Sequence, residues 1–120
     1  MAASAAFTLT INTIADGPFS LYSILSTGLA PTGCTLGTGA NITPYTGKPI
    51  AFANIQAESG GDVYLGDSTL TGSTNMGLDL SSGGIMTIVP ERGGSAWANL
   101  IYFNASANST VINFWIIYGT

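Results

Sequence analysis

Apolar and polar side chains alternate along the chain in short runs, which is the pattern of half-buried β-strands. In the run 7–13, Phe7, Leu9 and Ile11 share one face, while threonine and asparagine occupy the other. The same reasoning predicts strands at 19–25, 50–57, 63–65 and 85–89. For the run 50–57 a helix is an alternative, but the glycine, threonine and asparagine residues elsewhere in the chain favour a strand.

The last apolar run, 111–118, has only Asn113 as a polar interruption. A strand of a solvated sheet normally shows one polar face. We therefore expect one face of this strand in the core and the other covered by a loop or by a neighbouring subunit. For Trp115, which lies within the run, the core is favoured over an interface.

Turn-forming residues separate these runs and set the expected fold. Gly83 and Gly84 suit a tight hairpin between strands at 78–80 and 85–89. The segment 26–47 is rich in Gly, Thr and Pro and is expected to run over the surface, with short strands possible only at 34–36 and 41–43. No capped, apolar-periodic helix is predicted.

About eight short strands with closely spaced turns predict an all-β fold, a single jelly-roll-like β-sandwich. The sandwich is expected to span residues 7–120. Residues 1–6 are small and apolar and are expected to form a flexible N-terminal arm.

Composition narrows the range of partners. Only 7% of the 120 residues are charged, while 46% are hydrophobic and the mean hydropathy is +0.40. The surface must consist mainly of Ser, Thr, Asn and Gly, or be partly covered by other subunits. The net charge of −4, with only Lys48 and Arg92 as cations, argues against nucleic-acid binding. We expect no membrane segment, because the longest apolar run is far shorter than the ~20 residues of a spanning helix, and no signal peptide.

The residues available for chemistry argue against an enzyme. The sequence contains no histidine, which removes Ser-His-Asp triads and His-ligated zinc. Cys34 is the single cysteine, so no intrachain disulfide can form, and it is expected to be a buried structural thiol. No catalytic residue and no cofactor are predicted.

Three acids, Asp62, Asp67 and Asp79, lie close together in the sequence. Calcium binding and glycosidase chemistry are the functional alternatives for such carboxylates. Asp residues at turns usually bond their own backbone, and no Asp-x-Asp-x-Asp-Gly loop is present. The turn interpretation is therefore favoured, and no metal is predicted.

Large aromatic residues are the candidates for an interface: Trp97, Trp115 and Tyr118. Such residues dominate both cores and interfaces. Trp97 follows a glycine-rich turn, and for it core and interface remain open. A different hypothesis is a carbohydrate-binding module in which Trp97 or Tyr45 stacks on a sugar ring.

One stretch resembles a known group of proteins. Gly61-Asp62-Val63-Tyr64-Leu65-Gly66-Asp67-Ser68 is followed by a Gly-x-x-Leu step, a glycine-rich turn, an apolar strand and Asn99-Leu100-Ile101-Tyr102-Phe103. This order resembles small β-structured proteins of tailed-bacteriophage particles. The resemblance covers residues 61–118. Ser82-Gly83-Gly84 stands where that group usually has Pro-Gly-Glu, and residues 1–60 show no such resemblance.

The resemblance implies a non-enzymatic virion protein, assembled in the host bacterial cytoplasm. A capsid decoration (cement) protein of this kind would bind the major capsid protein on the outer capsid surface, stabilise contacts between capsid subunits, and act as a homo-oligomer, with a trimer favoured. The alternatives are a neck, tail or head-fibre component of the same fold, or the carbohydrate-binding module.

Overall fold

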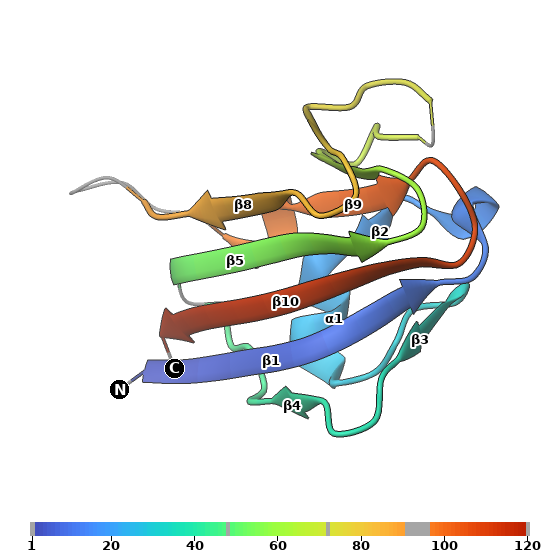
Figure 1. Cartoon of the computed structure of the whole chain (residues 1–120). Coiled ribbons are helices and arrows are strands. Elements are labelled where there is room, and N and C mark those ends of the chain that lie inside the picture. The colour runs from blue at the N-terminus through green and yellow to red at the C-terminus, as the bar shows by residue number, and fades with distance from the viewer. Residues whose placement is uncertain (1, 48, 72, 91–96, 120) are drawn as a thin grey trace.

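The computed structural model describes residues 2–47, 49–71, 73–90 and 97–119, and its strands form two antiparallel sheets that make a β-sandwich (Figure 1). This confirms the all-β prediction. The larger sheet contains, in order, β3 (Cys34–Leu36), β1 (Ala2–Ile11), β10 (Thr110–Gly119), β5 (Ile50–Ser59) and β8 (Ile85–Ile88), with β4 (Asn41–Ile42) also paired to β1. The smaller sheet contains, in order, β2 (Phe19–Ser20), β9 (Tyr102–Ala105), β6 (Val63–Gly66) and β7 (Leu78–Leu80).

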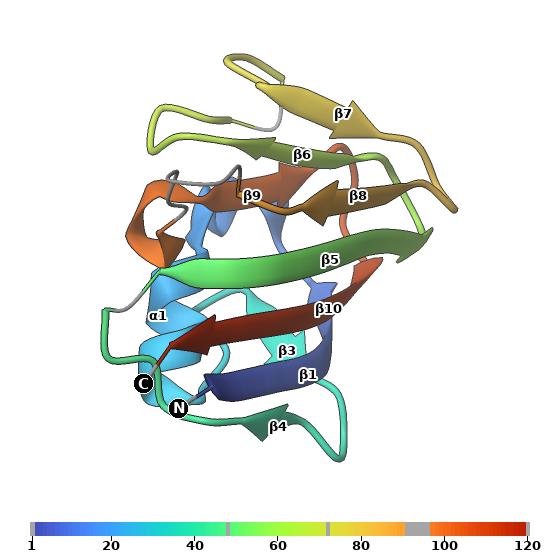
Figure 2. The same ribbon diagram turned by 90° about the vertical axis from the view of Figure 1, so that its left-hand side faces the viewer.

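The turn at 81–84 is tight, but the hairpin predicted around it is wrong. Gly83 adopts a φ of 86°, as such a turn requires. However, β7 pairs with β6 and β8 pairs with β5, so the turn carries the chain from one sheet to the other (Figure 2). Backbone hydrogen bonds between Ala57 and both Gly83 and Gly84, at 2.6 and 2.9 Å, hold the turn against β5.

Residues 2–6 lie in the sheet and do not form the expected arm. They are the first half of β1 and pair with the end of β10, from Ala2 opposite Gly119 to Ala6 opposite Trp115. Alternation explains this placement, because Ala3 and Ala5 are buried while Ser4 and Ala6 are exposed. The small side chains had concealed a strand pattern that continues the run 7–13.

A helix, α1 (Leu21–Thr27), replaces most of the strand predicted at 19–25. The Ser20 side chain caps its N-terminus by accepting a hydrogen bond from Ser23 N–H at 3.3 Å. Gly28 ends it in the left-handed conformation with a φ of 70°. The helix packs its three buried side chains against the core: Leu21, Ile24 and Leu25.

The core lies between the two sheets and contains a chain of aromatic rings. Phe7 and Phe114 stack at a centroid distance of 4.8 Å within the larger sheet. Phe114 contacts Phe103 of the smaller sheet at 5.3 Å, and Phe103 contacts Phe19 at 5.7 Å. These contacts join β1, β10, β9 and β2 across the sandwich.

An irregularity at the start of β5 changes which side chains face outward. The register shifts between Ile117 and Tyr118, so Tyr118 lies opposite Ile50 while Ile117 lies opposite Phe52. Ile50 therefore faces the core, although alternation alone had placed it on the same face as Phe52. From Phe52 onward the strand alternates regularly and presents Phe52 on the outside.

Candidate functional site

The first candidate site is the outer face of the larger sheet, defined as the side chains of β1, β10, β5 and β8 that point away from the smaller sheet. Strand pairing arranges them in rows across the sheet. The central row consists of Ala6, Trp115, Asn54 and Thr87. None of these side chains is charged, and the two flanking rows are uncharged as well: Ser4, Ile117 and Phe52 on one side, and Thr8, Asn113, Gln56 and Ile85 on the other.

Trp115 is the most prominent residue of this outer face. Its side chain is 52% exposed, which differs from the core position favoured from the sequence. The register explains the difference: Phe114 pairs with Phe7 and both face inward, so the next residue must face outward. Phe52 contacts Trp115 edge to face at a centroid distance of 5.3 Å. Two bulky rings are thus held in the middle of a surface-exposed sheet.

Polar side chains on the outer face bond mainly to one another. Thr8 Oγ1 donates to Asn113 Oδ1 at 2.7 Å, and Asn113 Nδ2 donates to Gln56 Oε1 at 3.1 Å. These two hydrogen bonds run across three adjacent strands and join the Thr8, Asn113 and Gln56 side chains. Asn54 differs: its Oδ1 is buried and, among the described residues, has no hydrogen-bond partner.

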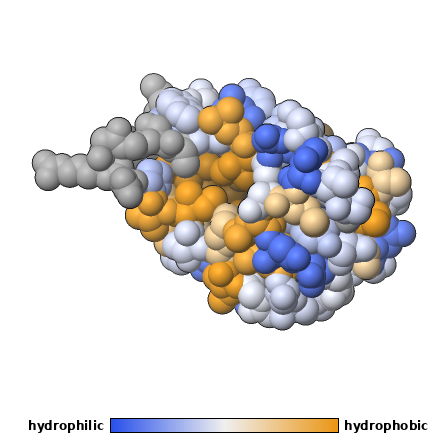
Figure 3. Space-filling view, turned by 90° about the horizontal axis from the view of Figure 1, so that it is seen from above, coloured by the Kyte–Doolittle hydropathy of each residue, from blue (hydrophilic) through white to orange (hydrophobic). Residues whose placement is uncertain are grey.

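The apolar character of the larger sheet continues to its β8 edge. Ile85 is 57% exposed and Val89, just beyond the strand, is 63% exposed. Seen from above, the molecule carries several apolar surface patches with hydrophilic residues between them (Figure 3). Exposed apolar patches bordered by polar groups commonly mark interaction sites.

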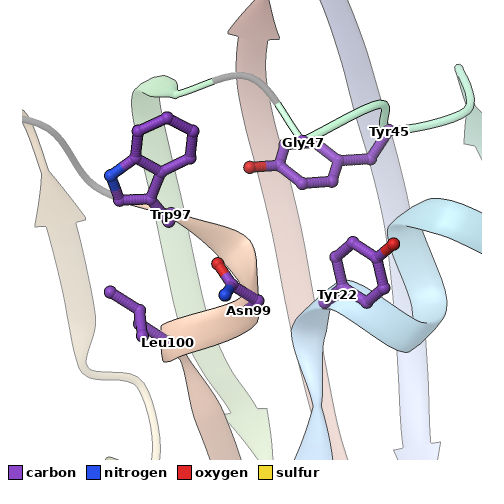
Figure 4. Close-up of a pocket in the computed structure, with 6 residues that line it drawn as sticks. All are labelled: Tyr22, Tyr45, Gly47, Trp97, Asn99 and Leu100. Carbon is purple, nitrogen blue, oxygen red and sulfur yellow. The ribbon is translucent and has the colours of Figure 1, made fainter.

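The second candidate site is an aromatic pocket with a volume of about 610 Å³. Three separate segments line it: helix α1, the segment before β5, and the short 3₁₀ helix η2 (Ala98–Leu100) with the residue before it. The lining residues are Tyr22, Tyr45, Gly47, Trp97, Asn99 and Leu100 (Figure 4).

Tyr45 occupies the floor of this aromatic pocket. It is 5% exposed, and its ring packs edge to face against Tyr22 at 5.8 Å and against Tyr118 at 5.2 Å. Its hydroxyl oxygen accepts a long hydrogen bond of 3.4 Å from Ala98 N–H. In Figure 4 this hydroxyl points toward the space between Trp97 and the η2 residues. Tyr45 therefore offers a fixed polar atom between aromatic walls.

Tyr22, Trp97 and Leu100 form the walls of the aromatic pocket. Tyr22 is 42% exposed and Leu100 is 64% exposed, while Trp97 is half-buried. A hydrogen bond from Leu21 N–H to the Ile101 carbonyl, at 3.1 Å, ties the start of α1 to the end of η2. This bond fixes the two walls relative to each other.

The three aromatic residues selected from the sequence are therefore in different surroundings. Trp97 lies in the aromatic pocket together with Tyr45, the two residues considered for sugar stacking. Trp115 lies on the outer face. Tyr118 is 1% exposed, donates its hydroxyl to the Thr43 carbonyl, and belongs to the core, so it cannot serve as an interface residue. Burial raises the pKa of Tyr118.

Sequence reasoning missed Tyr22, Asn99 and Leu100 as pocket residues. Alternation predicts a strand at Tyr22 and does not reveal that this residue lies on the outside of a helix. The available signal was the combination of Ser20 and Gly28 as helix caps with an apolar spacing typical of a helix between them.

Of the three acids, Asp67 has the turn role that the sequence favours. Asp67 Oδ1 accepts hydrogen bonds from the Thr69 hydroxyl and backbone N–H, and these bonds lower the pKa of Asp67. Loss of hydration raises the pKa of Asp79, and so do the hydrogen bond that its protonated carboxyl donates to Asp62 and the negative charge of Asp62. Among the described residues, no three His, Cys, Asp or Glu side chains gather closely enough to hold a metal ion.

Cys34 is half-buried and packs at the border of the core. Burial, with a smaller contribution from the Asp16 charge, raises the pKa of the Cys34 thiol to about 12. A thiol of this kind is protonated at neutral pH and is a poor nucleophile.

Comparison with known protein families, curated proteins and solved structures finds no match for the chain. Within the described ranges, no helix has the length and apolar character needed to cross a membrane.

Proposed function

We propose that this protein is a non-enzymatic structural component of a tailed-bacteriophage particle, a decoration protein that binds the outer surface of the capsid. Its partner would be the major capsid protein, and the protein would bind as a homo-oligomer, with a trimer favoured. The observation that carries the proposal is the set of three uncharged rows on the outer face of the larger sheet, with Trp115 and Phe52 at their centre. The resemblance of residues 61–118 to virion proteins supplies the type of particle.

An uncharged face suits permanent docking because burying it requires no ion to lose its hydration. Trp is the residue type most enriched where binding energy concentrates, and Trp115 leaves half of its surface free in the unbound protein. The two hydrogen bonds along the row of Thr8, Asn113 and Gln56 can be kept when the row is covered, which lowers the cost of burying these polar side chains.

We also infer that the sandwich is a jelly roll, as the sequence predicted. The inference is supported by the strand order, in which β1-β10-β5-β8 lies in one sheet and β2-β9-β6-β7 in the other. Eight strands arranged as two Greek keys define this fold, which occurs in viral capsid and lectin domains. A fold alone does not determine function, so the proposed role in a virion is supported by the outer face and the resemblance.

The copy number of the chain tests the proposal. Quantitative mass spectrometry of purified particles should give a ratio to the major capsid protein near one or near a simple fraction. A few copies per particle would shift the assignment to a neck, tail or fibre component, and absence from particles would refute the proposal.

A binding measurement then tests the outer face. Recombinant Trp115→Ser should bind particles at least ~30-fold more weakly than the unchanged protein, as expected for the loss of about 2 kcal/mol at a central aromatic residue. Leu29→Ser is the matched control, because Leu29 is 68% exposed and lies between α1 and β3, outside both sheets. Equal binding by both variants would show that another surface docks.

A further inference from the structure

We propose that the aromatic pocket lined by Tyr22, Tyr45 and Trp97 binds a neutral sugar ring. This inference does not rest on capsid binding, because no pocket-lining residue belongs to the outer face of the larger sheet. The volume of about 610 Å³ is within the range of small-molecule sites, roughly 300–1,000 Å³. Such a pocket accommodates a terminal sugar with part of its neighbour.

The chemistry of the lining matches a sugar in two respects. A pyranose has apolar C–H faces, which favour contact with the electron-rich faces of aromatic rings. Trp97 and Tyr22 supply such rings on different walls of the aromatic pocket (Figure 4). Leu100, at 64% exposure, adds an apolar surface at the rim.

The rim of a sugar carries hydroxyl groups that both donate and accept hydrogen bonds. The Asn99 side chain is exposed and offers one carbonyl acceptor and two N–H donors. The Tyr45 hydroxyl already accepts from Ala98 N–H, so its proton is available to a ligand oxygen. The pocket therefore combines aromatic walls with a small number of fixed polar groups.

The same lining disfavours other classes of ligand. None of the described lining residues is charged at neutral pH, so neither a phosphate nor a cation would find an oppositely charged partner among them. A purely apolar ligand would leave the Asn99 amide and the Tyr45 hydroxyl without partners at a cost in affinity. A neutral polyhydroxylated ring avoids both penalties.

The pocket is also largely preformed. Tyr45 is held by edge contacts with Tyr22 and Tyr118, and the Leu21–Ile101 backbone bond joins the two walls. Rigid walls lower the entropic cost of binding a ligand.

The test is an array printed with neutral oligosaccharides such as glucans, galactans, mannans and xylans, and with acidic glycans and apolar probes for comparison, to which the 120-residue protein is applied. Binding to at least one neutral glycan is expected, followed by titration of that glycan with tryptophan fluorescence and calorimetry. Trp97→Ala should weaken binding at least tenfold, and Asn99→Ala should weaken it several-fold. Circular dichroism confirms that each variant is folded.

Trp115→Ala is the matched control, because it removes the exposed tryptophan of the outer face and should leave glycan affinity unchanged. A blank array, or glycan binding that persists in folded Trp97→Ala, would overturn the proposal. Binding restricted to acidic glycans or to apolar probes would also overturn it. The result is separate from capsid docking, in which the Trp115→Ser variant should fail.

Discussion

Thr110 is the residue whose replacement gives the sharpest test of how the two sheets are joined. It is fully buried, and its hydroxyl donates to the Ala107 carbonyl at 2.8 Å and accepts from Gly61 N–H at 2.9 Å. Gly61 lies in the connection from β5 to β6, and Ala107 in the connection from β9 to β10. One hydroxyl therefore links the two connections between the sheets at this end of the sandwich.

Thr110→Val keeps the shape of the side chain but removes both hydrogen bonds. Each bond contributes about 1 kcal/mol net, so the expected loss of unfolding free energy is about 2 kcal/mol. The Gly61 N–H and the Ala107 carbonyl lie close to the surface, so water can replace part of the lost hydrogen bonding. This keeps the loss of unfolding free energy from rising further. At roughly 4 °C per kcal/mol for a chain of this size, Tm should fall by about 8 °C.

Thr110→Ser is the informative control, because it keeps the hydroxyl and removes only a buried methyl group, at a cost of about 1 kcal/mol. Urea and thermal unfolding should therefore rank the unchanged protein above the Thr110→Ser variant, and both above Thr110→Val. Reasoning from apolar burial alone gives the opposite order for the two variants. If Thr110→Val is as stable as Thr110→Ser, the proposed role of the hydroxyl is refuted.

The remaining predictions concern ionisable groups. Tyr118→Phe removes the bond to the Thr43 carbonyl and should lower the unfolding free energy by about 1 kcal/mol, measured by urea unfolding; no change would contradict the bond. Cys34, with a thiol pKa of about 12, should react with iodoacetamide at pH 8 at least tenfold more slowly in the folded than in the urea-unfolded protein, and equal rates would contradict the raised pKa. Because the folded-state pKa of Asp79 is raised, the folded protein holds that proton more tightly, so stability should fall as pH rises through the window above 3.8. Asp79→Asn should lessen this fall in parallel thermal melts, and an unchanged pH profile would rule out the coupling to Asp62.

Alternation along the sequence was sufficient to locate many strands but not their partners. The run containing Phe7, Leu9 and Ile11 was assigned correctly, because each residue's neighbours in the chain determine which face it occupies. The hairpin at Gly83 and Gly84 was wrong because partner choice depends on packing between distant segments. The same turn geometry serves a hairpin or a crossing between sheets.

For the candidate sites, too, the sequence identifies single residues, while packing between distant segments determines how they are arranged. Trp97 and Tyr45 were each identified as potential sugar-stacking residues, but only the packing of α1 and η2 places them in one pocket with Tyr22. Trp115 and Tyr118 lie three positions apart on one strand, and period-two alternation alone puts them on opposite faces. Which face is the core follows from the pairing of Phe114 with Phe7, which no local pattern reveals.

The pairing of Ala2 with Gly119 has a practical consequence for engineering. Opposed residues of antiparallel strands lie about 5 Å apart, so the two ends of the described chain emerge side by side at one end of the larger sheet (Figures 1 and 2). A short glycine-serine linker can join them, and new N- and C-termini can be placed in an exposed loop such as that between β6 and β7. The sandwich is thus suited to circular permutation, and equally to insertion as a cassette into a loop of another protein, since both junctions then leave from a single point.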